Sequence, residues 1–342
     1  MNLTSNPIFK DKEFLISHIK SIMRFYHPRC IDNENGGFFQ HFRDDGSVYD
    51  FDTRHLVSST RFIFNYSMAS IELDNDEYKD VIRHGIEYLR QFHLNTKTGS
   101  YAWILEGKDV QDSTNYCYGF AFVLLAYSTA LRAGILEAKD FIDETFDVME
   151  KHFWSKEHEL YSDEISADWQ VVSSYRGQNA NMHSCEALIM AFEATGSQKY
   201  LDRALIIAKN ICIRQASLAE GLIWEHYDSN WEINWVYNKD RPDDLFRPWG
   251  FQVGHLTEWA KLLLILERHV KEDWLLPRAI ELFDDAIEMG WDAESEGLFY
   301  GFSPNGDICD KDKYFWVQAE SIAAAAVLAN RTGDDYYWEW YD

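Results

Sequence analysis

The chain has 342 residues, 46% of them hydrophobic and 26% charged, a balance typical of a globular protein with a large core. Its 32 Lys and Arg against 57 Asp and Glu give a formal net charge of −25. A surface this acidic repels phosphate backbones, which argues against nucleic acid as a partner.

The N-terminal residues and the cysteines indicate the cellular compartment in which the protein is expected. Residues 1–14 lack the basic-then-apolar pattern of a signal peptide, and apolar stretches such as 120–127 are too short to span a membrane. The five cysteines form no Cys-x-x-Cys motif, which disfavours disulfide scaffolds and zinc ribbons. We therefore expect a reduced, cytoplasmic protein with no membrane partner.

One kind of segment recurs about every sixty residues: an acidic start, then an aromatic residue, then an amphipathic helix. Early acidic residues suit the N-terminus of a helix. In the second copy, Val81, Ile82, Ile86 and Leu89 form a one-sided apolar stripe. The pattern predicts outer helices with one solvated face, beginning around Phe14, Tyr78, Phe141, Tyr200, Trp274 and Tyr337.

Between these segments lie helices that are apolar nearly all round, as in residues 117–131 and 320–329. A helix without a polar face is buried, so these are predicted inner helices. They begin near residues 55, 115, 180, 253 and 316.

A turn with glycine or a polar cluster, followed by aromatic residues, comes after each outer helix. Short alternating runs after such a turn predict hairpin-like loops. The segments are NENGGFFQHF, TKTGSYAWIL, KEHELYSDE, AEGLIWEHY and SEGLFYGFS.

Six outer and five inner helices predict an all-α toroid, an (α/α)6 barrel formed by residues 1–342 as a single catalytic domain. The repeat is longer than tetratricopeptide or armadillo units, whose periods are about 34 to 47 residues. The chain stops at Asp342, soon after the last outer helix begins. We therefore expect the last inner helix to be missing and the C-terminus to be truncated.

Polar residues interrupt the inner helices near their first turns. Because inner helices run parallel in such a barrel, these side chains would ring one mouth, a site for catalysis or binding. They are Arg54, Asn115, Tyr118, Asn179, Asn181, His183, Arg247, Trp249, His255, Glu258, Trp316 and Glu320.

Two histidines in this set have a glutamate three residues later: His183 with Glu186, and His255 with Glu258. Residues at that spacing share a helix face, and a carboxylate beside an imidazole holds its tautomer and raises its basicity. The pairs are therefore candidate general acid/base units, although an ordinary ion pair has the same pattern. A metal site is disfavoured, because helical zinc motifs present two histidines four residues apart.

The other members of the set have less specific signals. The Arg54 guanidinium could bind a sugar hydroxyl or form an ordinary ion pair. Trp249 and Trp316 could stack on a sugar ring or fill the core. The histidines on outer helices and loops are expected to be solvated: His84, His93, His152, His158 and His269.

Four of these segments resemble the N-acylglucosamine 2-epimerase superfamily, and the resemblance runs over essentially the whole chain. They are DTRHLVSSTRF, RGQNANMHSCEAL, RPWGFQVGHLTEWAKLLLILER and WVQAESIAAAAVL. The Gly-His-x-x-Glu-Trp pattern in GHLTEWAKLLL resembles the aldose–ketose isomerase branch, D-mannose isomerases in particular. Mannose 2-epimerases share this pattern, whereas N-acylglucosamine and cellobiose epimerases resemble it less.

The resemblance implies an (α/α)6 barrel that works without a metal or redox cofactor. His255 corresponds to one of two catalytic histidines, and Glu258 to its carboxylate partner. The other catalytic histidine of the superfamily lies on the twelfth helix, which we expect beyond Asp342. Residues lining the sugar pocket correspond to Arg54, Asn179, His183, Arg247, Trp249, Trp316 and Glu320.

The implied reaction is the interconversion of D-mannose and D-fructose by proton transfer through a cis-enediol, and a 2-epimerase outcome remains open. Imidazole suits such a transfer because its pKa lies near neutrality. A glycoside hydrolase is an alternative, with Glu258 and Glu320, or Asp112, as the two carboxylates. A non-catalytic sugar-binding protein is another, and the oligomeric state is open.

Overall fold

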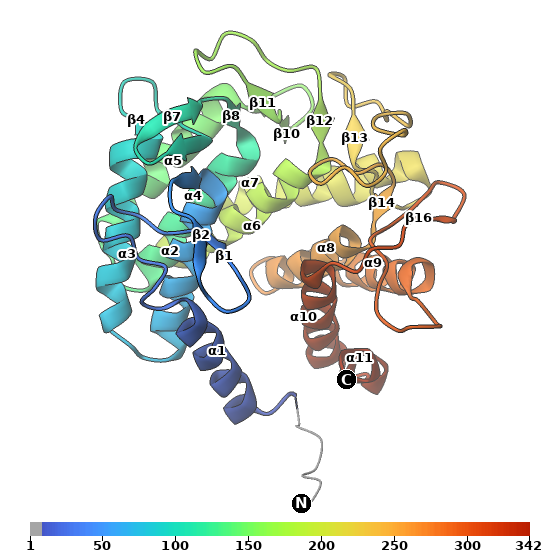
Figure 1. The fold of residues 1–342 in the computed structure, drawn as a ribbon. Coiled ribbons are helices and arrows are strands. Elements are labelled where there is room, and N and C mark those ends of the chain that lie inside the picture. Colours follow the sequence, from blue (N-terminus) through green and yellow to red (C-terminus); the bar gives the residue numbers. More distant parts are fainter. Residues whose placement is uncertain (1–8) are drawn as a thin grey trace, which may run out of the picture. The chain divides into compact units, whose positions relative to one another are not determined.

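The computed structural model describes residues 9–342, which divide into two compact units. The first comprises residues up to 152 with 165–171 and 193–196, and the second comprises 153–164, 172–192 and 197–342. Figure 1 shows the order of the elements along the chain. Each unit is described by itself.

Helices of the first unit pack in neighbouring pairs: α2 lies against α1, α3 and α4, and α4 lies against α5. A π-helical turn, η1 (Leu89–His93), extends α3. The helices are α1 (Lys12–Tyr26), α2 (Leu56–Glu72), α3 (Glu77–Tyr88), α4 (Cys117–Arg132) and α5 (Ala138–His152). The short strands are β1 (His41–Phe42), β2 (Val48–Asp50), β3 (Thr53–His55), β4 (Leu94–Asn95), β5 (Ser100–Tyr101), β6 (Ile104–Glu106), β7 (Asp109–Asp112) and β8 (Asn115–Tyr116).

In the second unit, α8 packs against α7, α9 and α10, and α10 also packs against α11. The helices are α6 (Gln178–Thr195), α7 (Gln198–Lys209), η2 (Asn210–Gln215), η3 (Ala216–Ala219), α8 (Val253–Glu267), α9 (Leu275–Gly290), α10 (Phe315–Thr332) and α11 (Asp335–Tyr341). The strands are β9 (Trp154–Ser155), β10 (Leu160–Tyr161), β11 (Glu164–Ile165), β12 (Arg176–Gly177), β13 (His226–Tyr227), β14 (Phe251–Gln252), β15 (Gly301–Phe302) and β16 (Ile308–Asp310).

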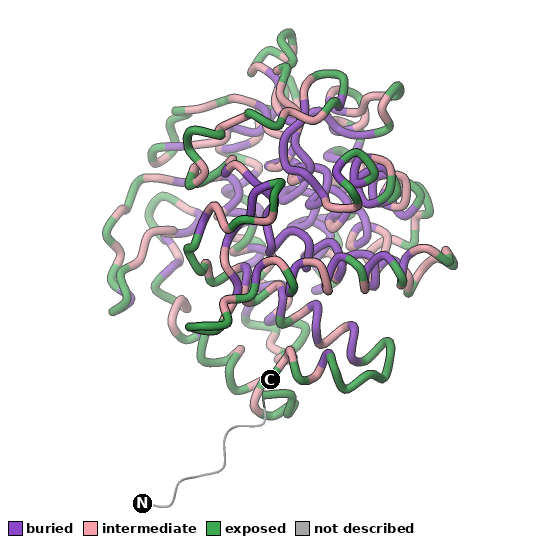
Figure 2. Tube along the Cα trace, turned by 90° about the vertical axis from the view of Figure 1, so that its right-hand side faces the viewer, coloured by how far each residue is buried: buried purple, intermediate pink, exposed green. Residues whose placement is uncertain are grey.

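The predicted contrast between inner and outer helices is confirmed. Residues 119–130 of α4 and 253–260 of α8 are buried without interruption, whereas α3 buries one face and exposes the other. In Figure 2, unbroken buried stretches contrast with helices in which buried and exposed positions alternate. The outer helices begin at or near each predicted aromatic residue, and the inner helices begin within a few residues of the predicted starts.

Most of the predicted loops form hairpins. Strand β4 pairs with β5 and β9 pairs with β10, each antiparallel. The segment after α7 behaves differently, because its strand β13 pairs with β12 from the segment before α6. This longer-range pairing brings residue 225 to the start of α6, which matters for the site.

Three further expectations can be compared with the structure. All five cysteines are free thiols. No described helix is both long and apolar enough to cross a membrane. The prediction that His93 is solvated is wrong: its ring is 1% exposed and bonded to the Ala102 carbonyl at 2.8 Å, because the π-helical turn directs it inward.

Candidate active site

The candidate site lies in the second unit, where the first turns of α6, α8 and α10 meet. Strand β12 runs directly into α6, and β14 runs directly into α8. The β12–β13 register pairs Gly177 with His226, and the next residue, Gln178, donates its backbone N–H to the carbonyl of Glu225 at 3.2 Å. The sheet therefore places the Glu225 side chain beside the start of α6.

His255, at the third position of α8, is held by a hydrogen-bonded chain. Its Nδ1 lies 3.0 Å from Oε1 of Glu225 and 3.0 Å from Nε2 of Gln178. The same amide nitrogen donates to both oxygens of Glu225, at 3.2 and 3.0 Å. The indole of Trp259 donates to Oε1 of Gln178 at 2.7 Å, which fixes the orientation of the amide.

Burial and the neighbouring charges shift the pKa of the His255 imidazole in opposite directions. Burial lowers the pKa of its imidazole, but the carboxylates of Glu225, Glu258 and Glu320 outweigh burial and raise the pKa above its ordinary value. The ring is therefore a stronger base than a free imidazole.

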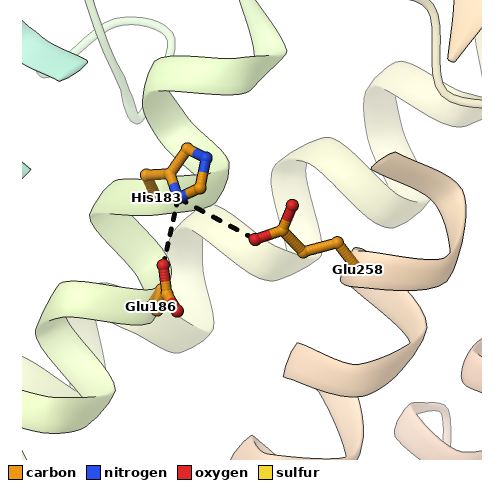
Figure 3. A group of neighbouring side chains, drawn as sticks. All are labelled: His183, Glu186 and Glu258. Atoms are coloured by element: carbon orange, nitrogen blue, oxygen red, sulfur yellow. Dashed lines mark hydrogen bonds and ion pairs between the residues drawn. The ribbon is translucent and has the colours of Figure 1, made fainter. Parts of the chain in front are cut away.

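The expected pairing of His255 with Glu258 is not formed. Glu258 turns instead toward α6, where its Oε1 lies 3.9 Å from Nδ1 of His183. The other predicted pairing is formed: Nδ1 of His183 lies 3.0 Å from Oε2 of Glu186, which accepts the hydrogen bond (Figure 3). The physical reason is that Glu225 already occupies the Nδ1 side of His255, so Glu258 acts on that ring through its charge alone.

Three carboxylates, Glu186, Glu258 and Glu320, surround one cation, Lys261. Lys261 forms an ion pair with Glu320 from α10. Burial opposes the charge of Lys261, but the three carboxylates together raise the pKa of its ammonium. Burial and the neighbouring Glu258 raise the pKa of Glu320, and Lys261 opposes this.

One group in this cluster has the composition of a metal site. Ligand atoms of His183, Glu186 and Glu258 lie within 4.8 Å of one another. Lys261 already supplies a positive charge to the two glutamates of this group. A divalent cation there would meet the repulsion of the ammonium, so the donor set does not favour a metal.

An aromatic wall lies beside His255. The ring of Trp316, at the second position of α10, lies 5.1 Å from the imidazole, with 37° between the planes. Gly254 makes this approach possible, because a methyl group there would lie 2.5 Å from Cζ3 of Trp316. Trp316 is only partly buried, so part of its ring is available to a ligand.

Other predicted residues of the second unit lie on the segments around this cluster. Arg247 donates to Glu164 at 3.1 Å and lies 4.0 Å from the Tyr175 ring. The Trp249 indole donates to the Trp235 carbonyl at 2.7 Å. The buried Oδ1 of Asn179, on α6, accepts no hydrogen bond from the described residues.

Three predicted residues belong to the first unit. Arg54 is 1% exposed, and its Nη2 donates to Oδ2 of Asp32 at 2.8 Å. Asn115 is buried and donates to the Ser166 carbonyl at 2.9 Å. Tyr118 is half-buried, and its ring lies 4.9 Å from that of Phe122. Their part in sugar binding stays a prediction.

A family model for N-acylglucosamine 2-epimerases matches residues 37–342. This chain belongs to the N-acylglucosamine 2-epimerase family. The D-mannose isomerase of Marinomonas mediterranea is 57% identical over 338 residues, which cover 98% of this chain and 85% of that protein. A D-mannose isomerase of Pseudomonas cannabina pv. alisalensis is 32% identical over 330 residues, covering 94% and 78%.

The crystal structure of a D-mannose isomerase matches with a TM-score of 0.97 at 57% identity, covering 98% of this chain and 86% of that one. The predicted (α/α)6-barrel fold is thereby confirmed for this member of the family.

The sequence analysis did not identify three residues of the candidate site: Gln178, Glu225 and Lys261. Gln178 opens an inner helix like the predicted residues, so its position was a usable signal. Lys261 lies three residues after Glu258 on a helix that is otherwise nearly apolar, which also marks it. Glu225 had no local signal, because only the β12–β13 pairing brings it to His255.

Proposed function

We propose that this protein is an aldose–ketose isomerase that interconverts D-mannose and D-fructose. Its similarity to enzymes named D-mannose isomerase supports this assignment. The observation that carries it is the state of His255: a carboxylate occupies Nδ1, so Nε2 is left as a proton acceptor beside an aromatic wall.

In the proposed reaction, Nε2 of His255 removes the C2 proton of the open-chain aldose. The C2–H electron pair forms the C1=C2 double bond, and the C1 carbonyl oxygen takes up a proton from solvent, giving a cis-enediol. The C1=C2 electron pair then takes the proton back from the imidazolium at C1, while the C2 hydroxyl releases its proton to solvent and becomes the ketone. The proton taken from solvent at C1 equals the proton released at C2, so the sugar is converted without an oxidant or reductant.

The neighbours of His255 supply the other requirements. The His183 imidazole, held by Glu186, can donate to the enediolate oxygens as negative charge develops. Trp316 offers a partly exposed ring for the apolar face of the sugar. Lys261 supplies positive charge among the glutamates, so the proposal needs no metal.

The test is His255→Asn with D-mannose as substrate. Asparagine keeps some hydrogen bonding but cannot shuttle protons near neutral pH, so kcat should fall about 10²–10⁴-fold. The matched control is His18→Asn, on the exposed face of α1, which should keep wild-type kinetics. A folded His255→Asn variant with near wild-type turnover would show that the proton moves through another group.

The products distinguish the remaining outcomes. Fructose supports the isomerase, glucose as the main product supports a 2-epimerase, and cleavage of an aryl mannoside supports a hydrolase. In D2O the isomerase should place deuterium at C1 or C2 of the product, partially if the original proton returns. A cytoplasmic location stays a prediction from the sequence.

A further inference from the structure

We infer that Glu225 is the positioning residue of the base, holding His255 in the tautomer and orientation that proton transfer requires, with Gln178 and Trp259 fixing the carboxylate. This rests on the proposed function of His255. Glu225 acts through the imidazole and is a residue that neither the His-x-x-Glu spacing nor the superfamily resemblance indicated.

The direction of each hydrogen bond follows from the donors. An indole N–H can only donate, so the 2.7 Å contact from Trp259 identifies the oxygen of the Gln178 amide. The amide nitrogen must then face Glu225 and His255, and it donates to both carboxylate oxygens. The amide cannot rotate without losing the indole bond, so Glu225 is held in place.

The tautomer of His255 follows in turn. Nδ1 lies 3.0 Å from a carboxylate oxygen, which can only accept, and 3.0 Å from the Gln178 amide nitrogen, which can only donate. A hydrogen bond to a charged acceptor is stronger than one between neutral groups, so the proton sits on Nδ1 and is donated to Glu225. Nε2 then carries the lone pair, which is the atom that must remove the C2 proton.

The deep burial of the three residues that hold His255 indicates a functional role for this arrangement. Gln178 and Trp259 are 0% exposed and Glu225 is 5% exposed. A buried carboxylate is costly unless it is paired, and all three bonds that offset the cost come from the amide and the imidazole. An apolar side chain could fill the same space without that cost, whereas only an acceptor can orient the imidazole.

Other titratable groups lie on the helices around His255, and Glu225 differs from all of them. Glu258 and Lys261 lie on α8, Glu320 on α10, and His183 and Glu186 on α6. The carboxylates of Glu258 and Glu320 act on the imidazole through space, whereas that of Glu225 is hydrogen-bonded to it. Removing Glu225 should therefore change both the orientation of the ring and its basicity.

The decisive variant is Glu225→Gln in the full chain, which keeps size and polarity but removes the charge. We expect kcat for D-mannose to fall at least about 10-fold with little change in KM. The acidic limb of the pH profile of kcat/KM should move to lower pH, because His255 loses a carboxylate that favours its protonated form. Glu225→Asp restores the charge and should return the limb toward its wild-type position while kcat recovers only in part.

The matched control is Glu232→Gln, an exposed glutamate in the segment that follows β13. It should leave kcat, KM and the pH profile unchanged. A folded Glu225→Gln variant with wild-type kcat and an unmoved acidic limb would overturn the inference. Should that variant fail to fold, the tautomer of His255 in the wild-type protein decides.

A readout independent of activity separates this inference from the proposed function. Side-chain ¹⁵N NMR, with His255 assigned through His255→Asn, should show the Nδ1–H tautomer in the wild type. The Nε2–H tautomer would overturn the inference even in an active enzyme. Conversely, a wild type that isomerises no aldose would refute the proposed function, while the Nδ1–H signal would still support the role of Glu225.

Discussion

Replacing Gly254 with alanine tests the packing of the candidate site. A methyl group at this position would lie 2.5 Å from Cζ3 and 2.7 Å from Cη2 of Trp316, and 3.0 Å from Cγ2 of Val317. Favourable carbon–carbon contacts begin near 3.5 Å, so the indole must move by about 1 Å. Because the contact is with the ring that faces His255, the move opens the aromatic wall of the site.

Two effects on stability oppose each other in Gly254→Ala. Alanine in a helix is favoured over glycine by about 0.5–1 kcal/mol, whereas overpacking costs about 1–3 kcal/mol. The added methyl group would be crowded by both the Trp316 ring and Val317, and the ring already lies against His255, so relaxation is restricted and overpacking should win. We expect a lower urea midpoint and, because a misplacement of about 1 Å can cost about 10²-fold, a large loss of kcat/KM.

A double-mutant cycle identifies the cause. Trp316→Phe removes the ring atoms that the methyl group would meet, so Gly254→Ala should cost less free energy of unfolding in that background. The assays are urea unfolding and initial rates with D-mannose for the four proteins. A Gly254→Ala variant that is more stable than the wild type and kinetically unchanged would refute the close packing of Trp316.

Three further outcomes can be measured. Chelation by EDTA should leave activity unchanged, because Lys261 supplies the positive charge in the carboxylate cluster; a loss restored by one divalent ion would contradict this. Burial raises the pKa of Asp163 to about 7. The folded state therefore keeps a proton that the unfolded carboxyl loses above about pH 4, so the free energy of unfolding falls as pH rises toward 7. In Asp163→Asn the amide oxygen can still accept the Gly177 N–H, but no charge forms, so the free energy of unfolding relative to wild type should rise from about pH 5 to about pH 8 in urea experiments. A constant difference would contradict the raised pKa. Arg54→Ala should cost about 3–5 kcal/mol of unfolding free energy because it leaves the buried Asp32 carboxylate without its cation, and adding Asp32→Asn should recover part of it. Equal stabilities would show that the ion pair does not matter.

Periodicity alone located the helices. The outer helices follow the acidic–aromatic segments, as in α3 after Tyr78, because one-sided burial leaves a one-sided apolar stripe. The inner helices α4 and α8 are apolar all round because they are surrounded by protein. The His183–Glu186 contact was also predictable, since residues three apart on a helix are neighbours whatever surrounds them.

The local sequence could not determine the partner of His255. Its spacing predicted Glu258, but a side chain at a helix start can turn toward other elements, and only the tertiary structure decides which element is near. Glu225 reaches His255 through the pairing of β12 with β13, which joins segments about 50 residues apart; such pairing depends on long-range contacts. The burial of His93 could not be predicted from the sequence for a related reason, because a π-helical turn directs its side chain inward. The sequence by itself thus determined which residues are helical, which helix faces are buried and that His255 lies in a polar cluster. The tertiary structure alone decided which carboxylate orients that imidazole, because the choice depends on where chain segments distant in sequence meet.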